Sequence, residues 1–360
     1  MAHFHITHIN LAHGFRGGER QTVLLIKALA KLNLMQCLIC RKESPLQELL
    51  KNTPNLKIKA VANKPDARLL GHFFLRHKSD LIQAHETLAA QSAYLHHCLF
   101  KTPYVITRRV DDRIRNNAFN QGMYKNAAAL VGVSSVIAKI MQDTFNVNAL
   151  TIHSAQAKLH VDPKLLLEIK KSWEGSFVIG HIGALVDHHK GQSTLIEATK
   201  LLKDKIPNLK VVFLGDGPDK EQLQEQACDL PIEFLGFHKN VQNYLAGMNI
   251  FAFPSNHEGL GSTILDAMSL QVPVIASAVG GIPDLVTHES SGLLIKPHDA
   301  QALAQEILRL HADEKLKAQL ISGGLEVAQK HTDDAMAYQY LTLYQSISSC
   351  FNAFNARHAN

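Results

Sequence analysis

Short apolar runs alternate with helical stretches along the whole chain, and this alternation limits the possible folds more than any other feature of the sequence. Each run has the length of a strand, and several segments between runs have apolar residues at helical spacing, notably 87–100 and 135–145. Strands that alternate with helices predict parallel sheets of the doubly wound α/β class. The predicted strands are 4–9, 37–40, 57–61, 81–84, 104–107, 130–133 and 150–152, then 177–184, 211–214, 233–235, 250–253, 274–276 and 293–295.

The length of 360 residues suits two domains, each large enough to bury its own core. The strand series divides at a polar stretch without strand pattern, which we interpret as a linker, and a helical tail follows the second series. One side of that tail is formed by Met336, Tyr340, Leu341 and Tyr344. The predicted boundaries are 1–153 for the first domain, 154–175 for the linker, 176–332 for the second domain and 333–360 for the tail.

Residues 250–268 have the pattern of a strand, a loop with two glycines and a helix. Backbone N–H groups and the positive end of a helix dipole then lie at a strand's carboxyl end, where they suit a phosphate. Glu258 in the loop is an acceptor for hydroxyl groups, and Asp266 follows in the helix. Phosphate donors beside hydroxyl acceptors predict a sugar nucleotide. The alternative is that these residues have structural roles only: Thr263 and Asp266 can form a capping box, and Glu258 can be a solvated loop carboxylate.

This segment resembles the retaining glycosyltransferases of family 4, whose mark is a strand, then Glu-x7-Glu, then a helix; here the two positions are Glu258 and Asp266. The resemblance covers most of residues 177–330, and in the first half only residues 17–20 and part of the strand pattern match. It implies the GT-B fold, with two Rossmann-like domains facing across a cleft and a tail that returns to the first domain. Further matching segments are 183–191, 213–217, 234–237, 272–277, 280–284 and 292–297.

The resemblance implies roles for residues of a nucleotide-sugar site. Glu258 would hold hydroxyl groups of the transferred sugar, and Asp266, one methylene shorter than the usual Glu, would bind the ribose. The backbone of Phe237 would lie near the base. Backbone N–H groups would contact the sugar and the phosphates at Gly259, Leu260, Gly261, Ser262 and Thr263.

Transfer from a nucleotide sugar requires stabilisation of the leaving diphosphate. The sequence contains no Asp-x-Asp pair to hold a divalent ion, so fixed positive charge and helix N-termini are the predicted means. Lys190 is the candidate cation, and we group it with Glu258 as the catalytic residues. The family usually has an arginine after the glycine equivalent to Gly183, and here that residue is Ala184. Candidates for the missing phosphate contact are Arg16, His188 and His189.

In the first half, Gly17 and Gly18 follow the first strand and precede a helix predicted from about Glu19. Glycines at such a turn let the backbone approach a ligand, so both are candidate donor-binding residues. The alternative is an ordinary strand-to-helix turn, because the spacing differs from that of the three-glycine dinucleotide fingerprint.

Arginines gather just beyond the strand that ends at residue 107. Planar guanidinium groups at a strand's carboxyl end suit phosphate or carboxylate recognition. The family often carries a histidine facing the reacting centre where Arg109 stands. Alternatively, Asp111 and Asp112 pair with these arginines at the surface. The acceptor-side candidates are Arg108, Arg109 and Arg113.

The first 150 residues carry 20 Lys and Arg against 9 Asp and Glu, a net charge of +11, whereas the remainder has a net charge of −6. A basic half suggests an anionic partner, and phospholipid head groups or a phosphorylated glycolipid are favoured over nucleic acid. The alternative is a basic surface that serves only solubility. No apolar run approaches the ~20 residues of a membrane span, and no leader pattern is present. We therefore expect a cytoplasmic protein, peripheral on the inner membrane's cytoplasmic face.

Cysteines and histidines do not indicate a metal site. Cys37 and Cys40 lie in one apolar run and are interpreted as reduced strand residues. His3, His5 and His8 belong to a predicted strand whose side chains alternate between faces, so they need not converge on an ion. We expect neither a metal nor a cofactor, the nucleotide sugar being a co-substrate.

These patterns together predict a glycosyltransferase of the hexosyltransferase type. It would move a sugar, from a donor predicted to be UDP-linked, to a cell-envelope glycolipid or lipopolysaccharide-core acceptor with retention of configuration. Two alternatives remain: a sugar-nucleotide epimerase, which shares the two-domain architecture, and a non-catalytic nucleotide-sugar-binding protein. Ala184 and Asp266 favour the second alternative, whereas the presence of Glu258 and Lys190 favours an enzyme.

Overall fold

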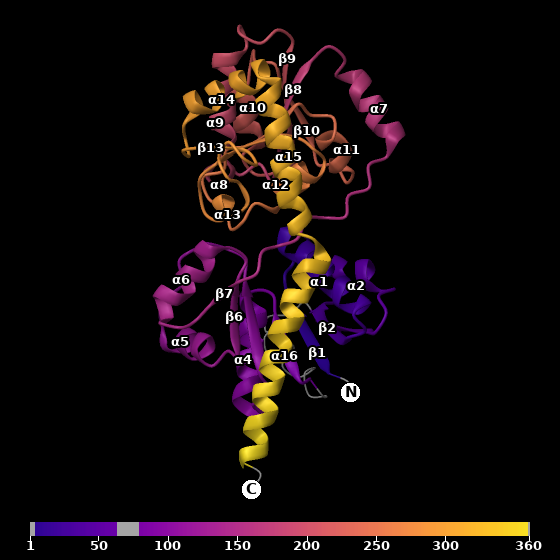
Figure 1. Cartoon of the computed structure of the whole chain (residues 1–360), viewed down its shortest axis with the longest axis vertical. Helices are drawn as coiled ribbons and strands as arrows, with labels where there is room; N and C mark the ends of the chain where they lie inside the picture. Colours follow the sequence, from indigo (N-terminus) through magenta and orange to yellow (C-terminus); the bar gives the residue numbers. More distant parts are fainter. Residues whose placement is uncertain (1–3, 63–78, 359–360) are drawn as a thin grey trace. The chain divides into compact units, whose positions relative to one another are not determined.

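The computed structural model describes residues 4–62 and 79–358. The chain forms two compact units, each an α/β structure built on its own sheet (Figure 1). Unit 1 comprises Met1–Ala155 and Thr332–Asn360, and unit 2 comprises Gln156–His331. The predicted linker contains a helix, α7 (Pro163–Ser172), which belongs to unit 2. His3 lies outside the described residues.

Unit 1 is built on a parallel sheet whose described strands have the order β3-β2-β1-β4-β5-β6-β7. The strands are rich in Val, Ile and Leu, because parallel strands are covered by helices on both faces. Their bounds are β1 His5–Asn10, β2 Met35–Arg41, β3 Leu56–Val61, β4 Leu81–Ala84, β5 Tyr104–Arg108, β6 Ala129–Gly132 and β7 Leu150–Thr151. The described helices of unit 1 are α1 Gly17–Lys31, α2 Pro45–Leu50, α4 Thr87–Phe100, α5 Ala118–Lys125, α6 Ser135–Phe145 and α16 Asp333–His358.

Unit 2 contains a second parallel sheet, with the strand order β10-β9-β8-β11-β12-β13. Its strands are β8 Phe177–Ile182, β9 Leu209–Leu214, β10 Ile232–Gly236, β11 Ile250–Phe253, β12 Val274–Ser277 and β13 Leu293–Ile295. Its further helices are α8 Asp187–Lys190, α9 Gln192–Leu202, α10 Lys220–Gln226, α11 Val241–Leu245, α12 Ser262–Ser269, α13 Ile282–Leu285, α14 Ala300–Ala312 and α15 Glu314–Lys330.

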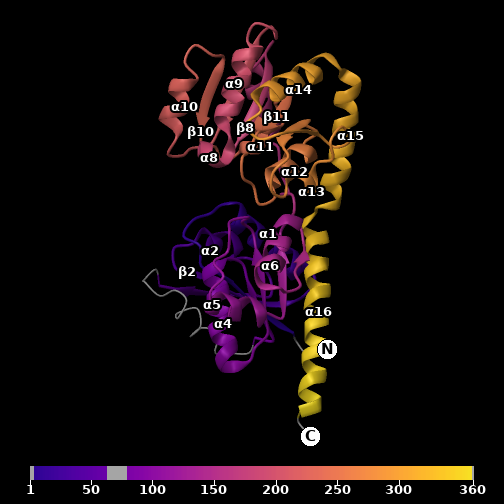
Figure 2. The same cartoon turned by 90° about the vertical axis from the view of Figure 1, so that its left-hand side faces the viewer.

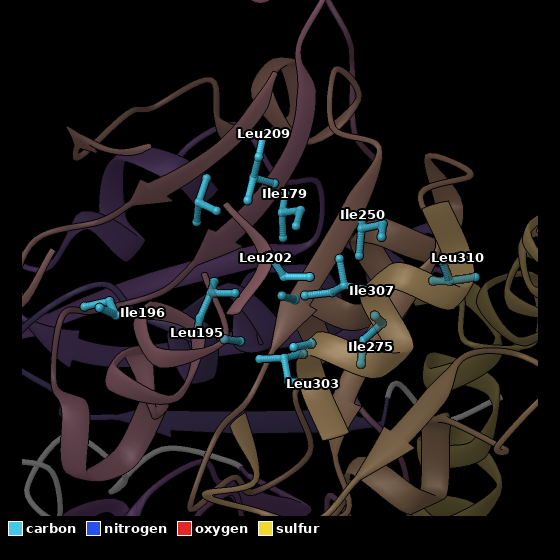
Figure 3. Packing of buried hydrophobic residues seen from close by; sticks show 14 of the residues in the cluster. Ile179, Leu195, Ile196, Leu202, Leu209, Ile250, Ile275, Leu303, Ile307 and Leu310 are labelled. Atoms are coloured by element: carbon cyan, nitrogen blue, oxygen red, sulfur yellow. The ribbon is translucent and has the colours of Figure 1, made fainter. Parts of the chain in front are cut away.

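One core of unit 2 lies between its sheet and the helices α9 and α14. Figure 3 shows Ile179 and Ile250 from the strands facing Leu202 and Ile307 from those two helices, and all four are buried. Because apolar residues recur at helical spacing on α9 and α14, each helix presents one continuous apolar side to the strands. This core fixes the strands whose carboxyl ends lead into the loops described below.

The helix α16 belongs to unit 1 although it is the last element of the chain. It packs against α1 (Figures 1 and 2), and its Met336, Tyr340 and Tyr344 are buried in a core with residues of α1 and of the sheet. Leu341, predicted on the same side, is half-buried.

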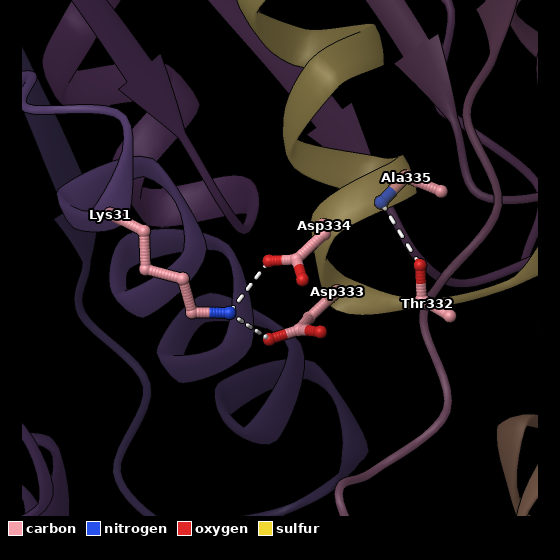
Figure 4. Close-up of polar contacts among 5 residues, drawn as sticks. All are labelled: Lys31, Thr332, Asp333, Asp334 and Ala335. Atoms are coloured by element: carbon pink, nitrogen blue, oxygen red, sulfur yellow. Dashed lines mark hydrogen bonds and ion pairs between the residues drawn. The ribbon is translucent and has the colours of Figure 1, made fainter.

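The first turn of α16 is fixed to unit 1 by charge. Lys31 at the end of α1 contacts Asp333 and Asp334, with Nζ–O distances of 3.2 and 2.6 Å (Figure 4). The Thr332 side chain accepts from the backbone N–H of Ala335 and caps the helix (Figure 4). Acidic residues at a helix start also complement the helix dipole.

Both sheets confirm the predicted doubly wound class, and every predicted strand is present, with ends shifted by one or two residues in places. Cys37 and Cys40 lie in β2 as strand residues. The helix predicted from about Glu19 begins earlier, at Gly17, because the Glu19 side chain accepts from the backbone N–H of Arg16 and closes the first turn. No helix in the described part of the chain has the length and apolar character that crossing a membrane requires.

Candidate active site

The centre of the second sheet is the point at which its winding reverses. Strands β8 and β11 are neighbours there, β9 and β10 continue to one side, and β12 and β13 continue to the other. In sheets of this kind, ligands bind outside the carboxyl ends of the two central strands. A ligand-binding site is therefore expected at the loops that follow β8 and β11.

These two loops are locked to each other by backbone contacts. The carbonyl oxygen of His189 accepts from the backbone N–H groups of Asn256 and His257, at 2.9 and 3.1 Å. Gly191 has a φ of +63°, and a Cβ there would collide with the carbonyl oxygen of Pro254. Only glycine allows this close approach. The loop after β8 therefore sits directly against the loop after β11.

This contact brings Lys190 and Glu258 together, and their assignment as catalytic residues stays a prediction. Lys190 Nζ and Glu258 Oε2 form an ion pair at 2.5 Å, and 23% and 16% of the two side chains are exposed. Lys190 Nζ also lies 5.4 Å from the centroid of the Phe253 ring. The pair is half-buried but open to solvent, so the ammonium can exchange the carboxylate for a phosphate and the carboxylate can accept from hydroxyl groups.

The predicted loop and helix start follow Glu258 directly. Gly261 is the N-cap of α12 with a φ of +84°, and no side chain caps the helix. The capping-box alternative is therefore wrong, because Thr263 lies inside the first turn. The backbone N–H groups of Ser262 and Thr263 point out of the helix start, where groups of this kind have no intrahelical partner. They suit an anion, as predicted for the segment Gly259–Thr263.

Asp266 lies deeper than the other candidates. It is 4% exposed, and its Oδ1 accepts from the backbone N–H of Ala157 at 3.1 Å. The carboxylate thus ties the first residues of unit 2 to α12. Its assignment to a ribose hydroxyl stays a prediction.

The remaining donor-side candidate of unit 2, Phe237, comes directly after β10, and 74% of its surface is exposed. It lies at the same carboxyl edge of the sheet as the Lys190–Glu258 pair, on an outer strand. The rings of His188 and His189 in α8 lie 4.2 Å apart, in the two positions before Lys190.

A buried histidine in β8, which the sequence analysis did not single out, lies beneath the loops of the site. His181 in β8 is fully buried; its Nδ1 donates to the carbonyl oxygen of Ala252 at 3.1 Å, and its Nε2 accepts from the Gln192 amide at 3.3 Å. The same amide nitrogen donates to the carbonyl oxygen of Ala184. Burial lowers the pKa of His181 to about 4, so the ring is neutral. A lone histidine inside an apolar run was the signal for such a residue.

The other candidates lie in unit 1. Gly17 and Gly18 form the first turn of α1, and the Arg109 side chain packs on Gly18, with Cδ 3.3 Å from where a Cβ would be. Arg108 donates to the carbonyl oxygen of Asp112 at 2.6 Å, not to a carboxylate. Arg113 is exposed. Arg16 is the N-cap of α1 and so belongs to unit 1 as well.

A metal site is not apparent in the described part of the chain. None of its clusters of three or more His, Cys, Asp or Glu side chains has the arrangement needed to hold an ion. His5 and His8 both lie in β1, and His8 is fully buried.

Two doubly wound parallel units are the architecture of GT-B glycosyltransferase structures. Residues 166–327 match the family described as glycosyl transferases group 1. The match covers less than half of the chain and lies within unit 2.

Several curated relatives of this chain have glycosyltransferase names. The chain is 30% identical over 58% of its length to 2-deoxystreptamine N-acetyl-D-glucosaminyltransferase of Niallia circulans, covering 56% of that protein. It is 29% identical over 73% of its length to the putative teichuronic acid biosynthesis glycosyltransferase TuaC of Bacillus subtilis, covering 71%. It is 32% identical over 47% of its length to the lipopolysaccharide core biosynthesis glycosyltransferase LpsD of Rhizobium meliloti, covering 49%. The chain thus spans about half the length of two of these three relatives.

A solved structure matches the whole fold. Anabaena HepE in complex with UDP and glucose superposes with a TM-score of 0.80, covering 96% of this chain and 100% of that one at 21% sequence identity. At 21% sequence identity, the similarity shows a shared fold only.

Proposed function

We propose that this protein transfers a sugar from a UDP-linked donor to a cell-envelope acceptor, a glycolipid or a lipopolysaccharide core, as a retaining enzyme of family 4. The observation that carries the proposal is the Lys190–Glu258 ion pair at the carboxyl ends of β8 and β11. One group of the pair suits a diphosphate and the other suits sugar hydroxyls, so together they match the two ends of a nucleotide sugar.

The donor and the acceptor are supported by different observations. The fold of unit 2 with its α12 start suits a nucleotide diphosphate, and HepE, of the same fold, was solved with UDP and glucose. For the acceptor, TuaC and LpsD are named for teichuronic acid and lipopolysaccharide core synthesis. The net charge of +11 over residues 1–150 favours an anionic acceptor at the cytoplasmic face of the inner membrane.

In the proposed reaction, Lys190 leaves Glu258 for the diphosphate while Glu258 accepts from hydroxyl groups of the sugar. The bond from the anomeric carbon to the phosphate oxygen breaks, and the bond to the acceptor oxygen forms on the same face. The acceptor's hydroxyl proton moves to the departing phosphate oxygen. Lys190 and the N–H groups of Ser262 and Thr263 stabilise the charge that grows on the diphosphate. Asp266 accepts from the ribose, and Phe237 lies near the base.

The direct test is to incubate the protein with UDP-, GDP- and ADP-sugars, with and without a crude bacterial lipid extract, and to follow both nucleotide release and the products. We expect UDP release that depends on the extract, and a glycosylated lipid product that Glu258→Gln abolishes. Conversion of one UDP-sugar into another without any acceptor would instead identify an epimerase. Binding of UDP-sugar without turnover under any condition would contradict catalysis.

A further inference from the structure

A chain of polar side chains crosses the first sheet through four neighbouring strands. Gln36 on β2, His8 on β1, His85 directly after β4 and Arg109 directly after β5 contact one another in that order. The distances are 3.0 Å from Gln36 Oε1 to His8 Nε2, 3.0 Å from His8 Nδ1 to His85 Nε2, and 3.5 Å from His85 Nδ1 to Arg109 Nη2. The first three side chains are buried in the sheet.

The hydrogen bonds among these four side chains have one consistent direction. The amide nitrogen of Gln36 donates to the carbonyl oxygen of Ile26, so its oxygen faces His8 and accepts from Nε2–H. His8 Nδ1 then accepts from His85 Nε2–H. His85 Nδ1 is left as the acceptor for Arg109, whose guanidinium can only donate. Burial lowers the pKa of His8 to about 4 and that of His85 well below its usual value, so both rings are neutral, with one donor and one acceptor each.

Arg109, the last of the four side chains, lies against the start of α1. The Arg109 side chain packs on Gly18, with Cδ 3.3 Å from the position of a Cβ, and any larger residue there would press on it. Within the described residues, Arg109 Nε is buried and has no hydrogen-bond partner. The guanidinium is thus fixed on one edge by His85 while another of its donors remains unused.

We propose that Gln36, His8 and His85 are positioning residues that orient Arg109 to bind a phosphate group of the acceptor. The inference rests on the proposed function, since it assigns the acceptor's charged group to unit 1. A fixed planar guanidinium binds an oxyanion better than a mobile one because less conformational freedom is lost. Arg108 is the last residue of β5 and Arg113 follows it by five residues, and this nearby positive charge favours a multiply charged phosphate over a carboxylate.

His85 offers a matched pair of variants. In His85→Asn the side-chain oxygen takes the place of Nδ1, so the acceptor for Arg109 is kept and the link to His8 is lost. In His85→Gln the amide reaches the place of Nε2, so the link to His8 is kept and the acceptor for Arg109 is lost. A purely structural role of His85 predicts similar effects of the two variants, whereas positioning of Arg109 predicts a difference between them.

The probe is inorganic phosphate, titrated calorimetrically into the whole protein saturated with UDP, so that the donor site is occupied. We expect Arg109→Ala to abolish phosphate binding, Arg109→Lys and His85→Gln to weaken it about tenfold, and His85→Asn to change it less than about threefold. Thermal melts check that each variant is folded. Unchanged phosphate binding in Arg109→Lys and Arg109→Ala, or equal binding in the two His85 variants, would overturn the proposal.

Two further arms identify the source of the phosphate. Vesicles of phosphatidylglycerol are compared with vesicles of phosphatidylcholine, and glucose 6-phosphate is compared with glucose. Dependence on Arg109 in the vesicle arm assigns the phosphate to a lipid head group, and dependence in the sugar arm assigns it to a phosphorylated saccharide. If binding depends on Arg109 in neither arm, the inference is contradicted. UDP binding, measured separately, reports on the donor site, so failure of the proposed function is distinguishable from failure at Arg109.

Discussion

Lys190 and Glu258 neutralise each other at the centre of the candidate site. Their contact at 2.5 Å keeps the ammonium beside an acceptor and holds it over Phe253. Any anion that binds to Lys190 competes with Glu258, and the competition frees the carboxylate for a hydroxyl donor. The two halves of a nucleotide sugar are therefore expected to bind together rather than independently.

The first prediction concerns Lys190. Because the charge on the leaving diphosphate grows in the transition state, Lys190→Ala is expected to lower kcat by about 10²–10³-fold with a smaller change in donor binding. Steady-state kinetics beside calorimetric titration of the donor separates the two effects. Wild-type turnover in a correctly folded Lys190→Ala protein would remove Lys190 from the mechanism.

The second prediction separates two roles of Asp266. Its Oδ1 accepts from the backbone N–H of Ala157, a bond that Asn can also accept and Ala cannot. If the carboxylate also binds the ribose, Asp266→Asn weakens UDP binding by about 1–3 kcal/mol while the melting temperature changes little. Asp266→Ala should lower both. An Asn variant with normal UDP affinity would leave Asp266 with only the structural role.

Residues at the site differ in how far the sequence predicts them. Lys190 ends the short helix α8 directly before Gly191, and Glu258 lies in a loop with two glycines. Neither charge has a role in a core, so both residues could be singled out. The neighbours of Asp266 could not be, because the contact with Ala157 joins residues 109 positions apart. The contacts of His8, His85 and His181 were missed for a different reason: whether a buried histidine has a partner depends on neighbouring strands, and the order of the strands cannot be predicted from one apolar run.

At the level of elements, the apolar runs predicted the strands because a parallel strand buried on both faces must be apolar along its length. The starts of helices were predicted unevenly. The helix α1 begins at Gly17 and not at Glu19, because the Glu19 side chain accepts from the backbone N–H of Arg16. The helix α12 follows the two-glycine loop, as the pattern of that segment predicted, and begins after Gly261, whose φ of +84° is allowed by the absence of a side chain.

The third prediction follows from this turn. A Cβ at Gly261 would lie 3.2 Å from Ile264, 3.3 Å from Phe253 and 3.4 Å from Glu258. Gly261→Ala should therefore destabilise the protein by about 1–3 kcal/mol through backbone strain and also reduce turnover by displacing Glu258. Gly175 is a matched control, with a φ of +74° and open space around it. Gly175→Ala should cost stability with unchanged turnover, and equal turnover in the two variants would contradict the role of the turn.

The fourth prediction concerns the strand β8 and its buried His181. Its pKa is about 4 in the folded protein and near 6.5 when unfolded, so between these values the unfolded chain binds more protons. The free energy of unfolding should therefore rise with pH over this range and fall as pH is lowered from 6.5 towards 4. His181 contributes a slope of about 1.4 kcal/mol per pH unit near pH 5.

Urea unfolding between pH 5 and 7 measures this slope. In His181→Asn the amide can still donate to the carbonyl oxygen of Ala252, and the slope near pH 5 should decrease by roughly that amount. A His181→Asn slope equal to that of the wild type would mean that His181 is protonated in the folded protein.

For the whole molecule, the fifth prediction is activity without a divalent metal. Lys190 and the start of α12 together provide positive charge for a diphosphate. Transfer measured in EDTA should equal transfer measured with added Mg²⁺ or Mn²⁺. Loss of activity in EDTA with rescue by either ion would mean that the diphosphate is held differently.

The position of α16 has a consequence for the order in which the protein is made. Unit 2 is one continuous segment, Gln156–His331, whereas unit 1 needs residues from both sides of it. The hydroxyl groups of Tyr340 and Tyr344 contact Thr107 and Gln83 inside unit 1, at 2.8 and 2.9 Å, and these tyrosines are synthesised after the whole of unit 2. During synthesis, unit 2 can therefore close while the earlier-made sheet still lacks its final helix. The usual rule that the amino-terminal domain is finished first is reversed here, and the nascent sheet stays open to chaperones until the tail arrives.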